Sequence, residues 1–247
     1  MGYRETVLRD RPFGYWPLDD AQDGTVARGW GPAGNATYTA TGVTKQINGP
    51  GAGLRKGVRC DGSTGHITLP SLNTWLGQTA QQTWEIWAHK STLMTVSANV
   101  LMYLFDATVG ATPQVIGLGG NFTGSASNEI VSLGNYNAAQ GQSYITGAAL
   151  TIPIGWHHYV FTYMGVKSGW RFFMDGAAWL IKPGSAEAAS NGGSNGMQNG
   201  TFTIANSLSS HETGSFAGVA FYNYRLSEGA IRRHYLEGRV GTMGMAA

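Results

Sequence analysis

Short apolar runs alternate with polar residues along most of the chain, and turn-forming residues separate these runs. A period of two residues is typical of β-strands, because successive side chains of a strand point to opposite faces. Within residues 83–90, Trp84 and Ile86 share one face while Trp87 lies on the other. A strand with large apolar side chains on both faces belongs in the interior of a sheet. We therefore predict an interior strand at this position.

The same alternation predicts that most of the chain forms short strands. Asp61-Gly62 and Asp175-Gly176 each predict a hairpin turn between two strands, because these residue types tolerate the positive φ angles of tight turns. The further predicted strands are 13–18, 57–62, 63–70, 100–105, 114–118, 128–133, 156–163, 169–174 and 215–224.

The segments between these runs are predicted to be connections. We expect residues 1–8 to lead into the first strand, and residues 21–57 to form a long connection with one or two short strands. Residues 184–200 are rich in Gly, Ser, Asn and Ala, which predicts a mobile surface loop.

A single helix is predicted near the end of the sequence. Ser227 is a suitable N-cap, and Glu228 favours the positive end of the helix dipole. Ile231 and Tyr235 lie four residues apart and would share one face, and Gly238 can end the helix. With no internal repeat or boundary visible, we predict one all-β domain over residues 1–247.

Composition narrows the classes of partner. Charged residues make up only 12% of the chain, and its net charge is +2, so no strongly basic surface for nucleic acid is expected. We see no apolar run of the length of a signal peptide or a membrane span, and therefore expect neither export by that route nor membrane insertion. Cys60 is the sole cysteine, so an internal disulfide is impossible.

Four segments together resemble the laminin G-like, concanavalin A-like jelly-roll superfamily, in the form found in bacterial surface proteins and in virion proteins of tailed phages. Each segment is short, but their order and spacing cover the chain from end to end. They are Gly14-Tyr15-Trp16-Pro17-Leu18-Asp19-Asp20, Asp61 to Pro70, Trp156-His157-His158-Tyr159-Val160 with Phe172 to Gly176, and Phe216 to Tyr222 with Leu226 to Gly238.

The resemblance implies a two-sheet antiparallel jelly-roll sandwich with six or seven strands in each sheet and with its termini close together. It implies no single activity, because the superfamily includes lectins, glycosidases and adhesion modules. Function has to be argued from the candidate site.

A catalytic role is not indicated by the acidic residues. A retaining glycosidase needs two carboxyl groups about 5–5.5 Å apart, which on one strand means acidic residues at alternate positions. Glu85 is followed at that spacing by Trp87 and His89, and we find no such acidic pair. His157 and His158 point to opposite faces of a strand, and we expect His158 to be a packed histidine. We predict that the protein is not an enzyme, although carboxylates from separate strands could still form a pair.

Two groups of residues are candidates for binding. Asp19, Asp20 and Asp23 could hold Ca²⁺ at a rim of the sandwich, because this ion prefers carboxylate and carbonyl oxygens; the alternative is that they are solvated turn residues. Most tryptophans are expected in the core, namely Trp16, Trp84, Trp156 and Trp170. Aromatic and amide side chains in loops could instead bind sugar rings, with an ordinary wet loop as the alternative. These ligand-binding candidates are Trp30, Asn135, Tyr136, Asn137, Gln140, Tyr144 and Trp179.

From the resemblance and the loop residues we expect a noncatalytic structural or recognition protein of a tailed-phage virion, either a minor tail protein or a capsid decoration protein. Its expected partners are other virion proteins, copies of itself and host-surface glycans, and its expected place is the virion surface or otherwise the extracellular space. The alternatives are a bacterial lectin or adhesion module, and a glycoside hydrolase.

Overall fold

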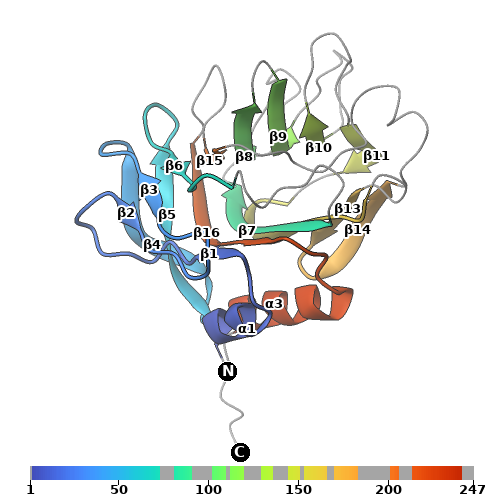
Figure 1. Cartoon of the computed structure of the whole chain (residues 1–247), viewed down its shortest axis with the longest axis horizontal. Coiled ribbons are helices and arrows are strands. Elements are labelled where there is room, and N and C mark those ends of the chain that lie inside the picture. Colours follow the sequence, from blue (N-terminus) through green and yellow to red (C-terminus); the bar gives the residue numbers. More distant parts are fainter. Residues whose placement is uncertain are drawn as a thin grey trace, which may run out of the picture.

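Two antiparallel sheets face each other across an apolar core, and two helices cover the outer face of one sheet (Figure 1). This arrangement confirms the predicted all-β sandwich. The computed structural model describes residues 2–72, 81–90, 102–109, 112–119, 129–135, 144–150, 153–165, 170–182, 201–205 and 213–240. Each sheet has eight strands in this part of the chain, more than the six or seven that the resemblance implied.

Sheet A is the layer against which both helices pack. In spatial order its strands are β14 (Ala177–Lys182), β13 (Trp170–Met174), β12 (Gly155–Tyr163), β7 (Gln82–Lys90), β16 (Thr213–Tyr222), β5 (Leu54–Asp61) and β4 (Val43–Gly51), with β1 (Gly14–Trp16) also paired to β16. Strand β7 pairs with β12 on one side and with β16 on the other. The prediction of an interior strand at residues 83–90 is therefore confirmed.

Sheet B forms the opposite layer. In spatial order its strands are β11 (Tyr144–Leu150), β10 (Glu129–Asn135), β9 (Thr112–Gly119), β8 (Met102–Val109), β15 (Thr203–Ile204), β6 (Ile67–Thr68), β3 (Ala36–Tyr38) and β2 (Val26–Ala27). Strands β6, β3 and β2 lie close to β4 and β5 of sheet A in Figure 1. Strand β2 is the edge strand at that end of sheet B.

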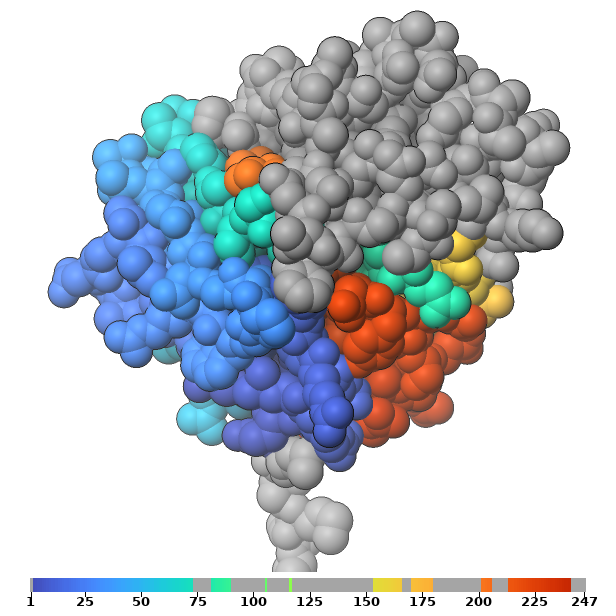
Figure 2. Space-filling model, in the orientation of Figure 1, coloured from blue at the N-terminus to red at the C-terminus, as the bar shows by residue number. Residues whose placement is uncertain are grey.

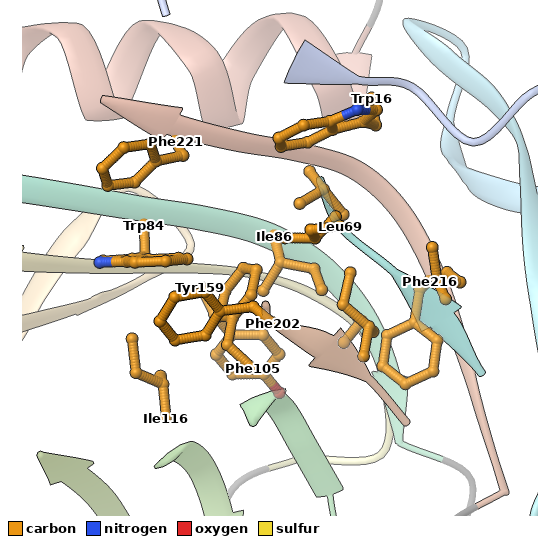
Figure 3. Close-up of a cluster of buried hydrophobic side chains, with 14 of the residues drawn as sticks. Trp16, Leu69, Trp84, Ile86, Phe105, Ile116, Tyr159, Phe202, Phe216 and Phe221 are labelled. Carbon is orange, nitrogen blue, oxygen red and sulfur yellow. The ribbon is translucent and has the colours of Figure 1, made fainter. Parts of the chain in front are cut away.

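The main core fills the space between the sheets, and Trp84 packs there against other aromatic side chains (Figure 3). The ring centroid of Trp84 is 4.9 Å from that of Phe105, 4.7 Å from that of Phe202 and 4.6 Å from that of Phe221. These partners come from both sheets and from a loop, so one aromatic side chain joins three segments that are distant in sequence. Cys60 is also buried in this core as a free thiol.

A second core lies on the outer face of sheet A, beneath helices α1 (Tyr3–Arg9) and α3 (Glu228–Val240). Trp87 is buried there, and its ring stacks on those of His158 and Tyr235. Because α1 and α3 both pack on this face, the N-terminal and C-terminal segments lie side by side on the surface in Figure 2.

Two predictions about the helices need correction. The segment expected to lead into the first strand instead holds α1, in which Tyr3 and Val7 share one helical face and are both fully buried. Gly238 does not end α3, which continues to Val240. Its role is a close approach, since a Cβ atom there would lie 2.5 Å from the ring of Trp87. Ser227 does cap α3, with its hydroxyl oxygen accepting a hydrogen bond from the Ala230 amide.

The two Asp-Gly turns differ. Asp175-Gly176 joins β13 to β14 with positive φ at both residues, as predicted. The hairpin predicted at Asp61-Gly62 is wrong, because β5 belongs to sheet A and β6 to sheet B. The Asp61 carboxylate instead accepts hydrogen bonds from the next turn of backbone and fixes the crossing between the sheets. The three donors, each at 2.9 Å, are the amides of Ser63, Thr64 and Gly65.

The connection predicted at residues 21–57 contains more structure than expected. It includes β2, β3 and the nine-residue β4, and it ends within β5. The sequence of β4 lacks apolar alternation, because Lys45 and Gln46 use their side chains to bind loop carbonyls. The sequence of β4 therefore has no hydrophobic periodicity from which a strand could be predicted.

A buried carboxylate joins the helices to sheet A. Glu85, on β7, is fully buried, and its two oxygens accept hydrogen bonds from four side chains. Those donors belong to α1, β12, β16 and α3, so both helices and the two strands that flank β7 contribute one each. They are the Tyr3 hydroxyl at 2.8 Å, His158 Nε2 at 2.9 Å, the Tyr222 hydroxyl at 3.3 Å and His234 Nδ1 at 2.9 Å.

His234 is held between two carboxylates. Its Nδ1 lies 2.9 Å from a Glu85 oxygen, and its Nε2 lies 2.9 Å from an Asp10 oxygen. Carboxylates only accept hydrogen bonds, so both ring nitrogens must donate and the ring is an imidazolium. Burial opposes this charge, but the two carboxylates outweigh burial and raise the pKa of His234. The same contacts hold the pKa of Glu85 well below its usual value despite complete burial.

Replacing Glu85 should be among the most damaging substitutions in the protein. We expect Glu85→Gln to lower the free energy of unfolding by about 3–5 kcal/mol, because the His234 charge would lose a buried partner. Urea unfolding would measure this loss. The matched control is Glu228→Gln, which removes an exposed partner of Arg171 and should cost less than about 1 kcal/mol. Equal losses in the two variants would contradict a structural role for Glu85.

The raised pKa of His234 also predicts a pH dependence. The folded protein binds this proton more tightly than the unfolded chain, so the stabilisation is complete below about pH 6.5 and is lost as pH rises towards the folded-state pKa. Unfolding curves at several pH values should therefore show a stability advantage of the wild type over His234→Gln that shrinks in the alkaline range. His66→Gln serves as the control, and an advantage that does not change with pH would disprove the imidazolium.

Candidate functional site

The candidate site is a pocket at the edge of the sandwich beside β2, which we call the rim pocket. It has a volume of about 350 Å³ and brings together residues that the sequence suggested separately, namely Trp30 and the three aspartates. Its wall consists of the loop after β1, the start of β2, the segment that follows β2 and one side chain from α1. The lining residues are Arg4, Asp19, Asp20, Ala21, Asp23, Gly24, Val26, Arg28 and Trp30.

Side chains of β4 hold the acidic loop in place. Gln46 Nε2 donates to the carbonyl oxygens of Asp19 at 2.5 Å and of Asp20 at 2.8 Å. The ammonium of Lys45, a residue with only 4% exposure, donates to the carbonyl oxygen of Gly24 at 2.5 Å. The backbone of the loop is therefore fixed from behind, while its carboxylates remain on the pocket side.

Arg4 is positioned by contacts on both sides of its guanidinium. The guanidinium carbon lies 4.7 Å from the centre of the Trp30 ring, and Nη2 lies 2.5 Å from a carboxylate oxygen of Asp19. A cation over an indole face is favourable, and here it also limits the freedom of a long side chain. Arg4 therefore presents its other N–H groups from a defined position.

The second aspartate of the pair faces in a different direction. The Asp20 carboxylate accepts a hydrogen bond from the Tyr38 hydroxyl at 2.8 Å and from the Arg28 amide at 3.3 Å. Burial and the Asp20 carboxylate both raise the pKa of Tyr38, so this hydroxyl stays protonated and donates. Adjacent residues 19 and 20 thus contact α1 and β3 respectively.

These contacts do not fit the calcium site expected at Asp19, Asp20 and Asp23. Within the described ranges, no group of three His, Cys, Asp or Glu side chains lies close enough to hold a metal ion. The loop carbonyls that could complete such a site accept hydrogen bonds from Lys45 and Gln46 instead. A buried ammonium on these oxygens would repel a divalent cation, so the contacts of this loop disfavour calcium, and the site stays a prediction.

The other predicted ligand residues do not join this pocket. Trp179 is partly buried and packs against the main core, with its ring 6.3 Å from that of Phe172. Asn135 is the last residue of β10 and Tyr144 the first of β11, and only their backbones are described. The predictions for Tyr136, Asn137 and Gln140 lie outside the described residues.

The predicted core tryptophans are largely where we expected them. Trp16, Trp84 and Trp170 are buried in the main core. Trp156 is only partly buried, and it packs on the outer face of sheet A, where its ring contacts that of His89.

The described carboxylates on the sheets offer no accessible acid-base pair. Glu85 is sealed beneath the helices, and its oxygens accept hydrogen bonds from four donors. Asp175 binds the ring of His157 at 2.7 Å and the amide of His158 at 2.9 Å, so it stabilises the turn between β13 and β14. Those contacts lower the pKa of Asp175 against the effect of burial. His158 is fully buried, as predicted.

Sequence reasoning missed the basic residues of the rim pocket. Arg4 comes from a helix that was not expected, and Arg28 stands alone in a polar stretch. The capping arrangement in which the Glu5 carboxylate accepts a hydrogen bond from the Gly2 amide was the one signal that could have revealed α1.

Comparisons with known proteins show the fold. No protein-family model and no curated protein sequence matches the chain. Among solved structures, domain 4 of AbnA, an extracellular GH43 arabinanase from Geobacillus stearothermophilus solved with arabinotriose, matches with a TM-score of 0.60 and 16% identity. The match covers 91% of this chain and 98% of that domain.

Two further structures are similar over the same range. The sialidase of Trypanosoma rangeli has a TM-score of 0.54 and 16% identity, over 92% of this chain and 33% of the sialidase chain. The binding domain of botulinum neurotoxin serotype G has a TM-score of 0.63 and 8% identity, over 91% of this chain and 50% of the toxin chain. At these identities the similarity establishes a shared β-sandwich fold.

The lysine-held loop predicts that calcium has no effect on stability. We expect the same melting temperature in millimolar calcium and in EDTA. Lys45→Met should lower the free energy of unfolding by about 1–3 kcal/mol, because it removes hydrogen bonds from a charged donor to two loop carbonyls. Differential scanning fluorimetry and urea unfolding would measure the two effects, with the exposed Arg59→Met as control. A higher melting temperature in calcium would restore the metal site.

Proposed function

We propose that this protein is a noncatalytic recognition module that binds glycans in the rim pocket. The observation that carries the proposal is the pocket itself, where an indole, two guanidinium groups and three carboxylates surround one cavity. Sugar-binding sites combine an aromatic surface for C–H groups with planar polar side chains for hydroxyl groups. The fold supports the proposal, since the similar arabinanase domain was solved with arabinotriose.

The geometry gives each pocket residue a role. Arg28 is exposed and can donate to sugar hydroxyls, and Asp23 can accept hydrogen bonds from them. Arg4 lies over the Trp30 ring, so a sugar would contact the guanidinium and the free part of the indole together. Because β4 fixes the loop from behind, little ordering is needed on binding, which favours affinity.

A catalytic role has less support at this pocket. The Asp19 carboxylate is neutralised by Arg4, and the Asp20 carboxylate accepts hydrogen bonds from Tyr38 and the Arg28 amide. A retaining glycosidase needs two carboxyl groups that are free to act on the substrate, and both of these carboxylates are engaged by neighbouring donors. Binding without bond cleavage is the simpler use of these groups.

We further propose that the module belongs to the virion of a tailed phage, as a minor tail protein or a capsid decoration protein that touches host-surface glycans. The resemblance of the four sequence segments to phage virion proteins supports this placement. A bacterial lectin or adhesion module is the second candidate, and the fold of the arabinanase domain and the toxin binding domain suits it equally. Within the described residues, neither helix has the length and hydropathy to cross a bilayer.

A glycan array followed by native mass spectrometry would test the proposal. We expect Arg28→Ala and Trp30→Ala to weaken binding of the best glycan by about tenfold, because each removes one strong contact worth about 1.4 kcal/mol. Arg59→Ala, which changes an exposed arginine outside the pocket, should bind like the wild type. Arg28→Ala keeps the test valid if the tryptophan variant is unstable.

Two results would contradict the proposal. One is the absence of binding to every glycan on the array. The other is release of reducing sugar from a polysaccharide by the wild type, which would make the protein a hydrolase.

A further inference from the structure

A second cavity adjoins the rim pocket on the other side of the Arg4–Asp19 ion pair. We call it the helix pocket; its volume is about 310 Å³, and it lies between the start of α1, the end of β1 and the turn from β4 to β5. Arg4 and Asp19 line both cavities. The remaining lining residues are Gly2, Tyr3, Glu5, Tyr15, Pro17, Ala52, Gly53, Leu54, Arg55 and Lys56.

The helix pocket has an excess of positive charge. Arg55 Nε donates to the Ala52 carbonyl at 3.2 Å, and Lys56 Nζ donates to the Gln46 carbonyl at 3.3 Å. Among the described residues, neither side chain forms an ion pair with a carboxylate. The two acidic residues are engaged, because Glu5 accepts a hydrogen bond from the Gly2 amide and Asp19 pairs with Arg4. The lining therefore holds three cations and two carboxylates, a net excess of one positive charge.

A buried hydroxyl group in the wall gives an independent indication of a ligand. Tyr15 is fully buried and lines the helix pocket, and its hydroxyl group makes no hydrogen bond of good geometry within the described structure. A buried hydroxyl without a partner is costly. Burial raises the pKa of Tyr15, and the nearby Arg4 guanidinium opposes this shift only in part, so the hydroxyl keeps its proton. Arg4 can only donate hydrogen bonds, so the proton of the hydroxyl group is left without an acceptor among the described residues.

From this geometry we propose that the helix pocket binds the anionic group of an acidic saccharide, a carboxylate or a sulfate, while the adjoining sugar lies in the rim pocket. This inference rests on the proposed glycan recognition and specifies the ligand class. Arg55, Lys56 and Tyr15 donate to the anionic oxygens. Arg4, fixed between Trp30 and Asp19, donates to the parts of the ligand on both sides.

Matched ligands test the charge directly. Isothermal titration calorimetry with the full chain would compare tetragalacturonate with its methyl ester, and sulfated dextran tetrasaccharide with unmodified dextran tetrasaccharide. We expect the charged member of at least one pair to bind about tenfold or more tightly than its neutral partner, with an advantage that falls as salt increases. The two pairs separate carboxylate from sulfate recognition.

Variants connect this advantage to the pocket. The double variant Arg55→Gln/Lys56→Gln should remove the advantage of the charged ligand and leave binding of the neutral one unchanged. Tyr15→Phe should weaken the charged ligand several-fold and keep the aromatic packing. The control is Arg59→Gln, which changes an exposed cation on the same strand outside the pocket.

The outcomes distinguish the two proposals. If neutral and charged saccharides bind equally, or if the double variant keeps the charged advantage, the helix pocket is not the anion site and glycan recognition stands. If no saccharide binds on the array or in the calorimeter, both proposals fail.

Discussion

The hydrogen bonds to the Glu85 carboxylate determine how the outer face of sheet A is organised. A charged group without water is stable only when its oxygens are satisfied, and here the donors come from two strands and both helices. The Tyr3 hydroxyl and the His234 ring can reach that carboxylate only when α1 and α3 are docked. The network therefore couples the helix layer to the sheet and makes their positions interdependent.

The same layer explains where recognition can occur. Either outer face of a sandwich could bind a ligand, but in this protein the helices cover much of the outer face of sheet A. The cavities described above lie beside the start of α1 and the loop after β1. Lys45 and Gln46 of β4 give that loop a fixed backbone, so a polar site can persist without a metal ion.

The parts of the fold that could be predicted from the sequence are those marked by hydrophobic alternation or by a helix cap. The interior position of residues 83–90 and the capping of α3 by Ser227 were both readable, because alternation and capping are local signals. The crossing after Asp61 and the nature of residues 21–57 were not, because strand pairing and side-chain bonds to distant carbonyls depend on tertiary contacts. Helix α1 is short, and its stability comes from burial of Tyr3.

The candidate site was predictable only in part, for the same reason. Trp30 and the three aspartates stood out as loop residues without a core role, and the structure places them around one cavity. Their arginine neighbours could not be assigned, since Arg4 reaches Trp30 from a separate element. The expectation of a calcium site treated the aspartates as unpaired. In the structure, the buried Lys45, 22 residues after Asp23 in the sequence, donates a hydrogen bond to the Asp23 carbonyl.

The N-terminal segment that contains α1 contributes both to the buried Glu85 network and to the two cavities. Tyr3 closes the buried network, while Arg4, the next residue, forms the wall shared by the two cavities. The Gly2 amide is also bonded, to the Glu5 carboxylate. A tag or fusion partner placed directly before this segment would thus press on the recognition surface and on the attachment of the helix layer together. An attachment that follows α3 would also lie close to the helix pocket, because Arg239, near the end of that helix, donates a hydrogen bond to the Pro50 carbonyl beside the turn that lines this pocket.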